Sequence, residues 1–230
     1  MGNADRLAKY EKELQLFPAG INPASLWWMM VQLHMPQTVE VELLEFVQGA
    51  KMAAKTQLKA VNSKEFAEFA AGQRDESTVA NELYHYCTPR FFDKLKEAAA
   101  GTLTDRNMTL ELQDISIESA VVADVKYSQL TQTEYEAQTA GLGVLPFLWA
   151  SDATVEYMQI HVKTRSLETT KMTLIGQEEC LVLQDNTRMW TFGSKVGSEE
   201  EIEWQIVKTN AANNAAKQLS RTVYSDESRN

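Results

Sequence analysis

The sequence predicts an α+β domain in which N-terminal helices pack on one face of an antiparallel sheet. Before about residue 105 the apolar residues recur at spacings of three and four, as in amphipathic helices, and after it they tend to alternate, as in half-buried strands. Helices followed by strands in this way are typical of α+β domains. The clearest hairpin signal runs from Arg188 to Val207, where large apolar residues flank a Gly197–Ser198 turn: Trp190, Phe192 and Val196, then Ile202, Trp204 and Ile206.

The composition is that of a globular chain with an acidic balance. Its 230 residues suit one large domain or one domain with extensions, and the apolar fraction of 44% is enough for a core. The net charge of −10 disfavours a protein whose main task is to grip a nucleic-acid backbone. The two cysteines are expected to be free thiols. The longest apolar run, Leu26 to Val31, is far short of the ~20 residues of a membrane-spanning helix.

Residues 1–37 are predicted to form an N-terminal extension that carries an aromatic helix. Residues 4–15 indicate a short charged helix, and Ser25 is a candidate cap for a second helix that stops before Pro36. The second helix is apolar nearly all round, which predicts either packing on the domain's own core or a docking surface. Because two adjacent tryptophans cannot both face one core, this helix supplies candidate partner-interface residues: Trp27, Trp28, Met29 and Met30.

Four further helices are expected before the sheet. The clearest covers residues 38–61 and contains Phe46, together with the small residues Gly49 and Ala50, which usually mark the close approach of another element. The other three are expected over residues 63–72, 78–86 and 88–101, the last starting at Thr88–Pro89 and stopping at Gly101. We expect Trp190 and Trp204 to be buried beneath the helix over residues 38–61.

The strands are predicted from alternation and from turn residues. The first is expected over residues 108–130, with a bulge or a short break between Leu112 and Ile115. Residues 155–164 indicate a second long strand, and residues 170–184 indicate another strand or a short pair around Gly176.

Two further segments do not fit the compact unit. Residues 131–151 are too long for a tight turn and are predicted to be an insertion that includes the apolar residues Phe147, Leu148 and Trp149. Residues 209–230 are polar and are predicted to form an extended or disordered arm, with some helix near residues 211–219.

The order of elements and two local patterns resemble the C-terminal domain of the mitochondrial import-motor anchor, the Tim forty-four-like family. The first pattern spans residues 43–70, in which Phe46, Gly49 and Ala50 are similar to the Phe-x-x-Gly-Ala motif of the family's entry helix. The second is the Trp-x-Phe strand of Trp190 and Phe192, followed by Trp204. The resemblance covers residues 38–208 and marks a structural core: Phe46, Gly49, Trp190, Phe192 and Trp204.

The resemblance implies a cone of helices against a curved antiparallel sheet, as in nuclear-transport-factor-two-like proteins. It also implies a role without catalysis: a matrix-side adaptor at the mitochondrial inner membrane, a ribosome anchor, or an accessory subunit of a large inner-membrane complex. The chain departs from the family in the Gly193–Ser194 pair, in the acidic run of residues 199–201 and in the insertion.

Candidate catalytic or metal-ligating groups are sparse. No carboxylate or thiol lies at metal-ligand spacing from His34, His85 or His161, so neither a metal nor a cofactor is predicted. The alternative to a scaffold is a small-molecule-binding or lyase/isomerase-type enzyme, in which His161 pairs with Asp152 or Glu156 inside a cone-shaped pocket.

We therefore expect a non-catalytic scaffold or accessory subunit on the matrix side of the mitochondrial inner membrane. A respiratory-chain or ATP synthase complex is the favoured setting, and a ribosome or import-motor adaptor comes second. The extensions are expected to contact partner subunits, and a peripheral membrane contact is the weaker expectation, because residues 13–50 hold no Lys or Arg to attract anionic lipid. The acidic charge predicts no direct nucleic-acid binding.

Overall fold

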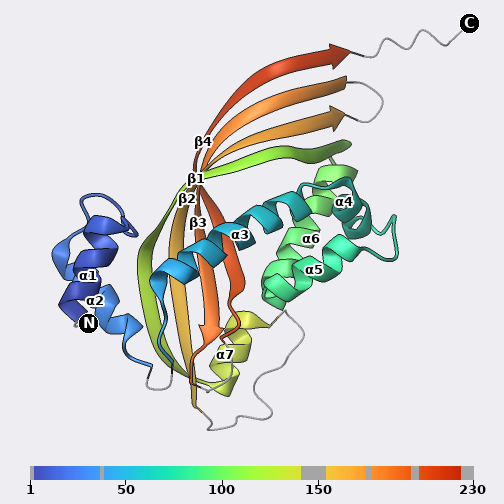
Figure 1. Ribbon diagram of the computed structural model, residues 1–230. Coiled ribbons are helices and arrows are strands. Elements are labelled where there is room, and N and C mark those ends of the chain that lie inside the picture. Colours follow the sequence, from blue (N-terminus) through green and yellow to red (C-terminus); the bar gives the residue numbers. More distant parts are fainter. Residues whose placement is uncertain (1–2, 37–38, 141–153, 175–177, 198–201, 224–230) are drawn as a thin grey trace, which may run out of the picture.

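The computed structural model describes residues 3–36, 39–140, 154–174, 178–197 and 202–223. Within these residues, helices surround a four-stranded antiparallel sheet whose strands lie in chain order, β1-β2-β3-β4. Figure 1 shows α3 crossing the strands, with α1 and α2 beside β1 and α4 to α6 towards the other side. This arrangement confirms the predicted α+β class with helices packed on a curved antiparallel sheet.

Over residues 3–36, the N-terminal extension forms three short helical segments: α1 (Asn3–Ala8), the π-helix η1 (Lys9–Glu13) and α2 (Pro23–Leu33). The side chain of Asn22 accepts a hydrogen bond from the Ala24 amide at 2.8 Å, and Pro23 occupies the first turn of α2. The cap therefore lies at Asn22 rather than at the predicted Ser25.

The main helices are α3 (Leu43–Val61), α4 (Lys64–Ala70), α5 (Thr78–Tyr86) and α6 (Pro89–Thr104). The Ser63 hydroxyl caps α4 through the Phe66 amide, as the sequence indicates. The prediction that α6 stops at Gly101 is wrong, since the helix continues for another turn and the Asp105 amide donates to the Gly101 carbonyl.

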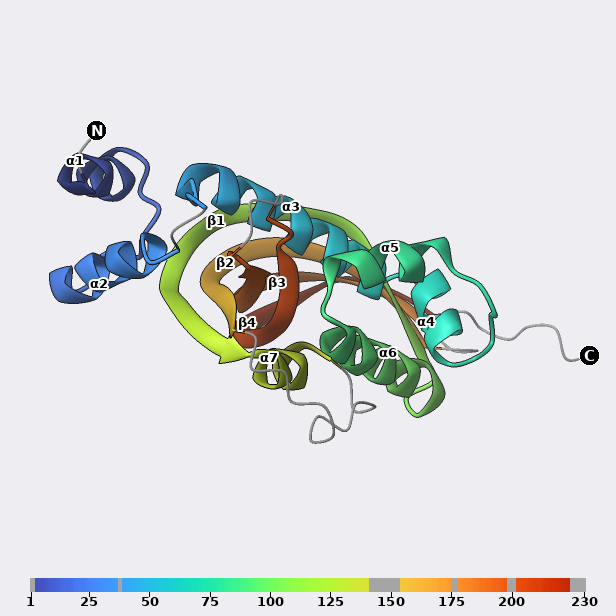
Figure 2. The same ribbon diagram turned by 90° about the horizontal axis from the view of Figure 1, so that it is seen from below.

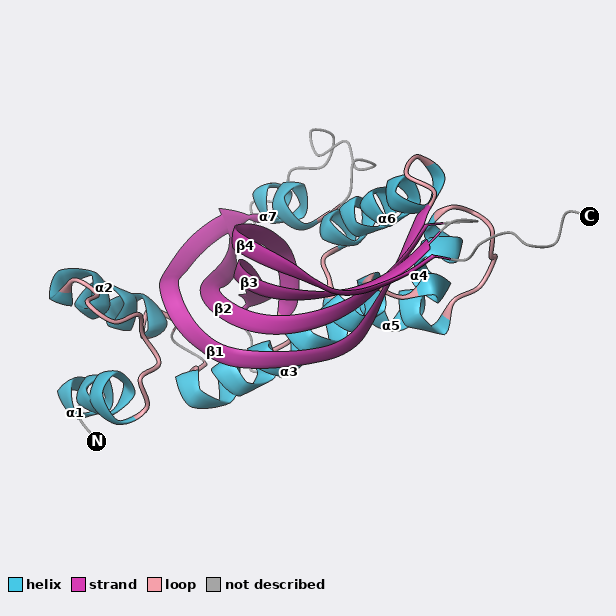
Figure 3. Cartoon of the chain, turned by 90° about the horizontal axis from the view of Figure 1, so that it is seen from above, coloured by secondary structure: helices cyan, strands magenta, loops and turns pink. Residues whose placement is uncertain are grey.

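The strands are long: β1 (Met108–Thr131), β2 (Thr154–Leu174), β3 (Glu178–Lys195) and β4 (Gln205–Val223). Figures 2 and 3 show that they curve strongly along their length. The register of β1 against β2 shifts at three places, and the shift between Leu112 and Asp114 is the predicted irregularity. Bulges bend a strand and increase its twist, so these shifts account for part of the curvature.

The pairing of β3 with β4 confirms a hairpin but corrects its extent. Phe192 lies opposite Ile206, whereas Trp204 precedes the first residue of β4. For residues 209–223 the predicted extended conformation is correct, but the alternatives of disorder and of a helix near residues 211–219 are wrong, because these residues continue β4 along β3. Backbone hydrogen bonds to β3 stabilise this strand although its side chains lack the alternation that identifies a half-buried strand.

The predicted insertion begins with a helix, α7 (Gln132–Thr139). Thr131 and Glu134 form a capping box, in which each side chain bonds the other residue's backbone amide. Residues 141–153, which include Phe147, Leu148 and Trp149, lie outside the described residues.

One hydrophobic core joins the helices, the sheet and the N-terminal extension. Of the predicted core residues, Phe46, Trp190 and Phe192 are buried, and Trp204 is partly buried against them. Gly49 is not a core residue, because a Cβ atom there would meet no heavy atom within 4 Å. The expected close approach of another element at Gly49 is therefore absent. Further buried members come from α1 to α2 and the intervening segment: Tyr10, Leu16, Phe17, Leu26, Met29, Met30 and Leu33.

The free edge of β1 is partly covered by other parts of the chain. The Val122 amide donates to the Leu16 carbonyl at 2.7 Å, and the Tyr127 amide donates to Oε1 of Gln32 at 2.8 Å. Uncovered sheet edges pair with other chains. The N-terminal extension therefore protects this edge as well as contributing to the core.

Candidate functional site

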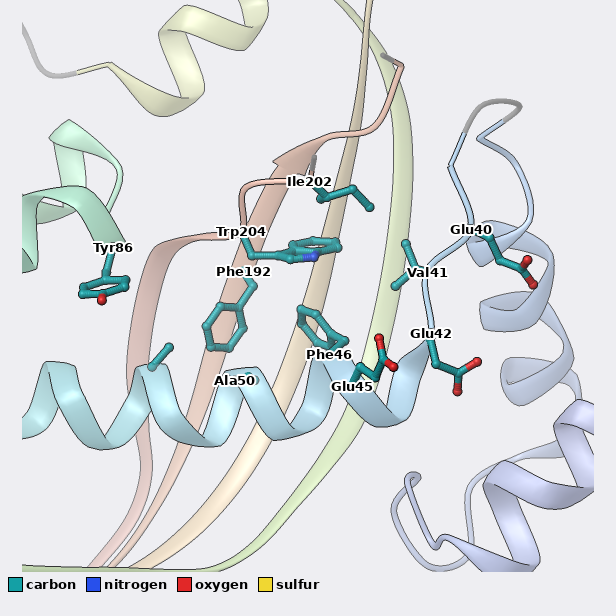
Figure 4. Close-up of a pocket in the computed structure, with 12 residues that line it drawn as sticks. Glu40, Val41, Glu42, Glu45, Phe46, Ala50, Tyr86, Phe192, Ile202 and Trp204 are labelled. Atoms are coloured by element: carbon teal, nitrogen blue, oxygen red, sulfur yellow. The ribbon is translucent and has the colours of Figure 1, made fainter. Parts of the chain in front are cut away.

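A groove with a volume of about 420 Å³ lies between α3 and residues 202–204, which precede β4. Figure 4 shows Phe46, Phe192 and Trp204 side by side above α3, with Tyr86 at one end and three glutamates at the other. We call this cavity the Trp204 groove. Its lining residues are Glu40, Val41, Glu42, Glu45, Phe46, Gly49, Ala50, Ala53, Tyr86, Phe192, Ile202 and Trp204.

The aromatic rings of the groove touch one another. The Phe46 ring meets Trp204 at a centroid distance of 4.7 Å and an interplanar angle of 63°, and it meets Phe192 at 5.6 Å and 90°. Both are edge-to-face contacts, which aromatic pairs favour. Rings this close leave no gap for a cation between their faces. They form a continuous apolar surface instead of an aromatic cage.

The α3 side of the groove is built from small residues. Gly49, Ala50 and Ala53 follow Glu42, Glu45 and Phe46 along one stripe of the helix. At 1.5 Å per residue, the stripe from Glu42 to Ala53 is roughly 16 Å long. The absence of side-chain bulk here opens the groove, and the helix tolerates Gly49 at its centre at a small cost in stability.

The acidic end of the groove is tied to the N-terminal extension. Arg6 pairs with Glu40 and, at 3.5 Å, with Glu42, while the Tyr10 hydroxyl donates to Oε1 of Glu42 at 2.8 Å. The pKa of Arg6 is raised, chiefly by its hydrogen bond to Tyr10. Within the described residues Glu45 is exposed and makes no ion pair or side-chain hydrogen bond. The site thus already holds one guanidinium and keeps unpaired negative charge beside it.

The predicted partner-interface residues divide into two groups. Trp27 and Trp28 have exposed fractions of 62% and 55%. Met29 and Met30, in contrast, are buried in the protein's own core, so their assignment to a partner surface is wrong. The helical period explains the division, because Leu26, Met29, Met30 and Leu33 share one face of α2.

The outward face of α2 is apolar as well. At helical spacing it carries Ala24, Trp27, Trp28, Val31 and the following Met35, of which Met35 has an exposed fraction of 48%. No charged residue occurs from Leu14 to Val39. We call the surface of these five residues the α2 outer face.

The structure does not bring His161 and Glu156 together. Ile160 and Val162 on β2 are buried in the core, so the His161 side chain lies on the opposite face of the strand, and Glu156 lies on the same face as Ile160. Nδ1 of His161 instead lies 3.1 Å from the Thr191 hydroxyl. Burial lowers the pKa of His161 and thus favours the neutral imidazole. The other proposed partner, Asp152, is outside the described residues.

Asp124 of β1 is the residue that pairs with His161 in the register of the sheet, and the sequence offered no signal for it. Its carboxylate raises the pKa of His161 but less strongly than burial lowers it. No group of three or more metal-ligating side chains occurs in the described part of the chain. Cys87 and Cys180 are free thiols, as expected from their number.

Sequence reasoning singled out six residues that line the Trp204 groove, but it assigned them to the core, to a helix motif or to the hairpin: Phe46, Gly49, Ala50, Phe192, Ile202 and Trp204. It gave no role to Tyr86 or to the three glutamates. The alternation around Ile202 shows which way its side chain faces. The clustering of Glu40, Glu42 and Glu45 around the start of a helix was the available signal for an acidic rim.

No helix among the described residues is long and apolar enough to cross a membrane. The chain matched no family model, no curated protein and no solved structure. The resemblance to the Tim forty-four-like family therefore stays a prediction.

Proposed function

We propose that this protein is a non-catalytic scaffold or accessory subunit that joins a larger protein assembly through the α2 outer face. The observation that carries the proposal is the pair of exposed indoles, Trp27 and Trp28, on a helix whose other face is fully engaged in the core. Tryptophan is among the residues most enriched at the energetic centres of protein interfaces.

The area of this face fits the centre of an interface rather than a complete one. With exposed fractions of 62% and 55%, the two indoles present roughly 300 Å² of accessible surface. At ~25 cal/mol per Å², their burial supplies about 7 kcal/mol before the costs of association. A stable interface covers about 800 Å² on each partner. The two indoles therefore supply less than half of one side of such an interface, and they fit an anchor that surrounding residues complete.

The anchor is held by a fixed platform. The segment before α2 and α2 itself bond to the edge of β1 through Leu16 and Gln32, and Met29, Met30 and Leu33 anchor the helix in the core. Little conformational entropy remains to be lost when a partner binds to such a preorganised surface. The absence of charge from Leu14 to Val39 favours an apolar protein surface over an anionic bilayer.

The proposal includes the setting that the family resemblance implies, an inner-membrane-associated mitochondrial assembly of the respiratory-chain or ATP synthase type. A ribosome or import-motor adaptor comes second within the same proposal. For the alternative of an enzyme centred on His161, Glu156 lies on the other face of β2 and Asp152 lies outside the described residues, so the described residues do not pair His161 with either carboxylate.

The test compares the native size of the assembly formed by tagged full-length variants in the source cells. Wild type and Met52→Ser, which alters another highly exposed apolar residue (69%), should migrate in a high-mass complex. The Trp27→Ser/Trp28→Ser double variant should migrate as a free chain of 25.9 kDa while retaining the circular dichroism and melting temperature of wild type. A double variant that still assembles, or a wild type that migrates as a free chain, contradicts the proposal.

A further inference from the structure

We infer that the Trp204 groove is a second binding site, separate from the α2 outer face, which takes an amphipathic helical segment of a partner protein bearing Lys or Arg at one end. The inference rests on the shape of the groove, on the contact geometry of its aromatic rings and on the charge at its rim.

The dimensions of the groove suit side chains projecting from a helix. A volume of about 420 Å³ lies in the lower part of the range of ligand pockets, ~300–1,000 Å³. The small residues Gly49, Ala50 and Ala53 allow a partner's backbone to approach α3 closely. The stripe of roughly 16 Å matches about eleven residues of helix, or three turns. Helices dock in such grooves through apolar residues spaced three and four apart.

The aromatic floor selects apolar side chains. Phe46 is in edge contact with both Trp204 and Phe192, so the rings present a joined surface on which aliphatic side chains can lie. The same contacts exclude a quaternary ammonium group enclosed by several ring faces, because that mode of recognition needs the rings to stand apart.

The rim selects the sign of the charge. Glu40 and Glu45 are exposed, and Glu42 lies between them in the sequence at the same end of the groove. Arg6 already forms ion pairs with Glu40 and Glu42, so a guanidinium group fits at this rim. A second cation can be received by the uncommitted Glu45, whereas an acidic peptide or a phosphate group is repelled. Exposed ion pairs contribute more to orientation and association rate than to affinity.

Gly49 permits a direct test, because a side chain there points into open space. A Cβ at Gly49 meets no heavy atom within 4 Å, so a leucine side chain there starts in open space and is expected to extend into the groove that Gly49 lines. Leucine and alanine are both better helix formers than glycine. The Gly49→Leu variant should therefore block the groove while keeping or raising the melting temperature, and Gly49→Ala is the matched control.

The probe is a fluorescein-labelled helical peptide of about eleven residues, with leucines at spacings of three and four and arginines near one end. Its comparison peptide has glutamates in place of the arginines. The full-length protein should bind the arginine peptide at least tenfold more tightly than the glutamate peptide. Gly49→Leu should weaken binding of the arginine peptide at least tenfold and Gly49→Ala less than threefold. Glu45→Lys should remove most of the preference for arginine.

The Trp27→Ser/Trp28→Ser variant separates this inference from the proposed function, since it should lose the assembly and keep the peptide. The inference is overturned if wild type binds neither peptide or does not distinguish them. It is also overturned if Gly49→Leu binds the arginine peptide as tightly as wild type does, or if the Trp27→Ser/Trp28→Ser variant no longer binds this peptide.

Discussion

Trp190 and Trp204 are two tryptophans of the same hairpin region in different surroundings. Trp190 has an exposed fraction of 0%, and its indole N–H donates to the Thr164 hydroxyl at 2.8 Å. Trp204 lines the groove, where its ring meets Phe46 but part of its surface faces solvent. Replacing each by the same smaller residue tests whether burial, rather than residue type, sets the energetic contribution.

The expected losses of stability differ by at least about twofold. Truncating a buried aromatic to alanine typically costs about 3–5 kcal/mol, because a cavity remains. For Trp190→Ala we expect about 4–5 kcal/mol, since the side chain is fully enclosed and the Thr164 hydroxyl loses its donor. Trp190→Phe keeps most of the volume and should cost about 2 kcal/mol, including ~1 kcal/mol for the hydrogen bond. For Trp204→Ala we expect about 1–2 kcal/mol, because the groove already admits solvent and no closed cavity forms.

The measurement is urea unfolding followed by far-ultraviolet circular dichroism, which does not depend on tryptophan emission. The midpoint should shift at a nearly constant m-value, so that each shift reports a change in stability. If Trp204→Ala destabilises the protein as much as Trp190→Ala does, the assignment of Trp204 to an open groove is wrong. Trp204 would then behave as a buried tryptophan, whose truncation costs about 3–5 kcal/mol.

Three further predictions concern Gly193, the cysteines and His161. Gly193→Ala should lower the unfolding free energy by about 1–3 kcal/mol, because its Cβ would lie 2.0 Å from the Tyr157 hydroxyl oxygen. In urea unfolding, adding Tyr157→Phe should recover part of this loss, whereas strictly additive effects of the two substitutions would contradict the contact. Burial raises the pKa of Cys87 to about 12, so a maleimide at mildly alkaline pH should label Cys180 in the folded protein and Cys87 only after unfolding. Equal labelling rates of the two cysteines, measured by mass spectrometry, would contradict the burial of Cys87. Because burial lowers the pKa of His161 below the ordinary 6.5, the unfolded chain takes up this proton first, and stability should fall as pH drops below about 6.5. His161→Gln should flatten that slope in urea titrations across the same pH range, and identical slopes would remove His161 as its cause.

The sequence predicted the elements of this fold where side chains alone determine the local structure. The Ser63 cap, the helix over residues 78–86 and the alternating apolar face of β2 are local patterns, and each matches the structure. The strand of residues 209–223 was missed because its stability comes from pairing with β3, while its own residues show no alternation of apolar and polar side chains. Propensity carries no information about a neighbour that supplies backbone hydrogen bonds.

The candidate site was only partly predictable for a related reason. Spacing shows which face of an element is apolar, but it does not show whether the space opposite that face is filled. Phe46 and Gly49 share a stripe of α3, and yet Phe46 is packed whereas Gly49 faces open space. The pairing of Asp124 with His161 likewise depends on a strand register shifted by bulges, which alternation does not specify.

The protection of the β1 edge decides how the partner surface must be tested. Leu16 and Gln32 satisfy backbone amides on that edge, and Met29 and Met30 belong to the same core as the sheet. A chain lacking residues 1–36 would expose both an unpaired strand edge and core side chains, and such edges recruit other chains. Loss of assembly in that truncated chain would follow equally from misfolding and from loss of an anchor. Trp27 and Trp28 make the two roles separable, because their side chains point away from the edge that their helix covers. Point substitutions on the α2 outer face remove the exposed indoles that are proposed to bind a partner, while the N-terminal extension still protects the edge of β1.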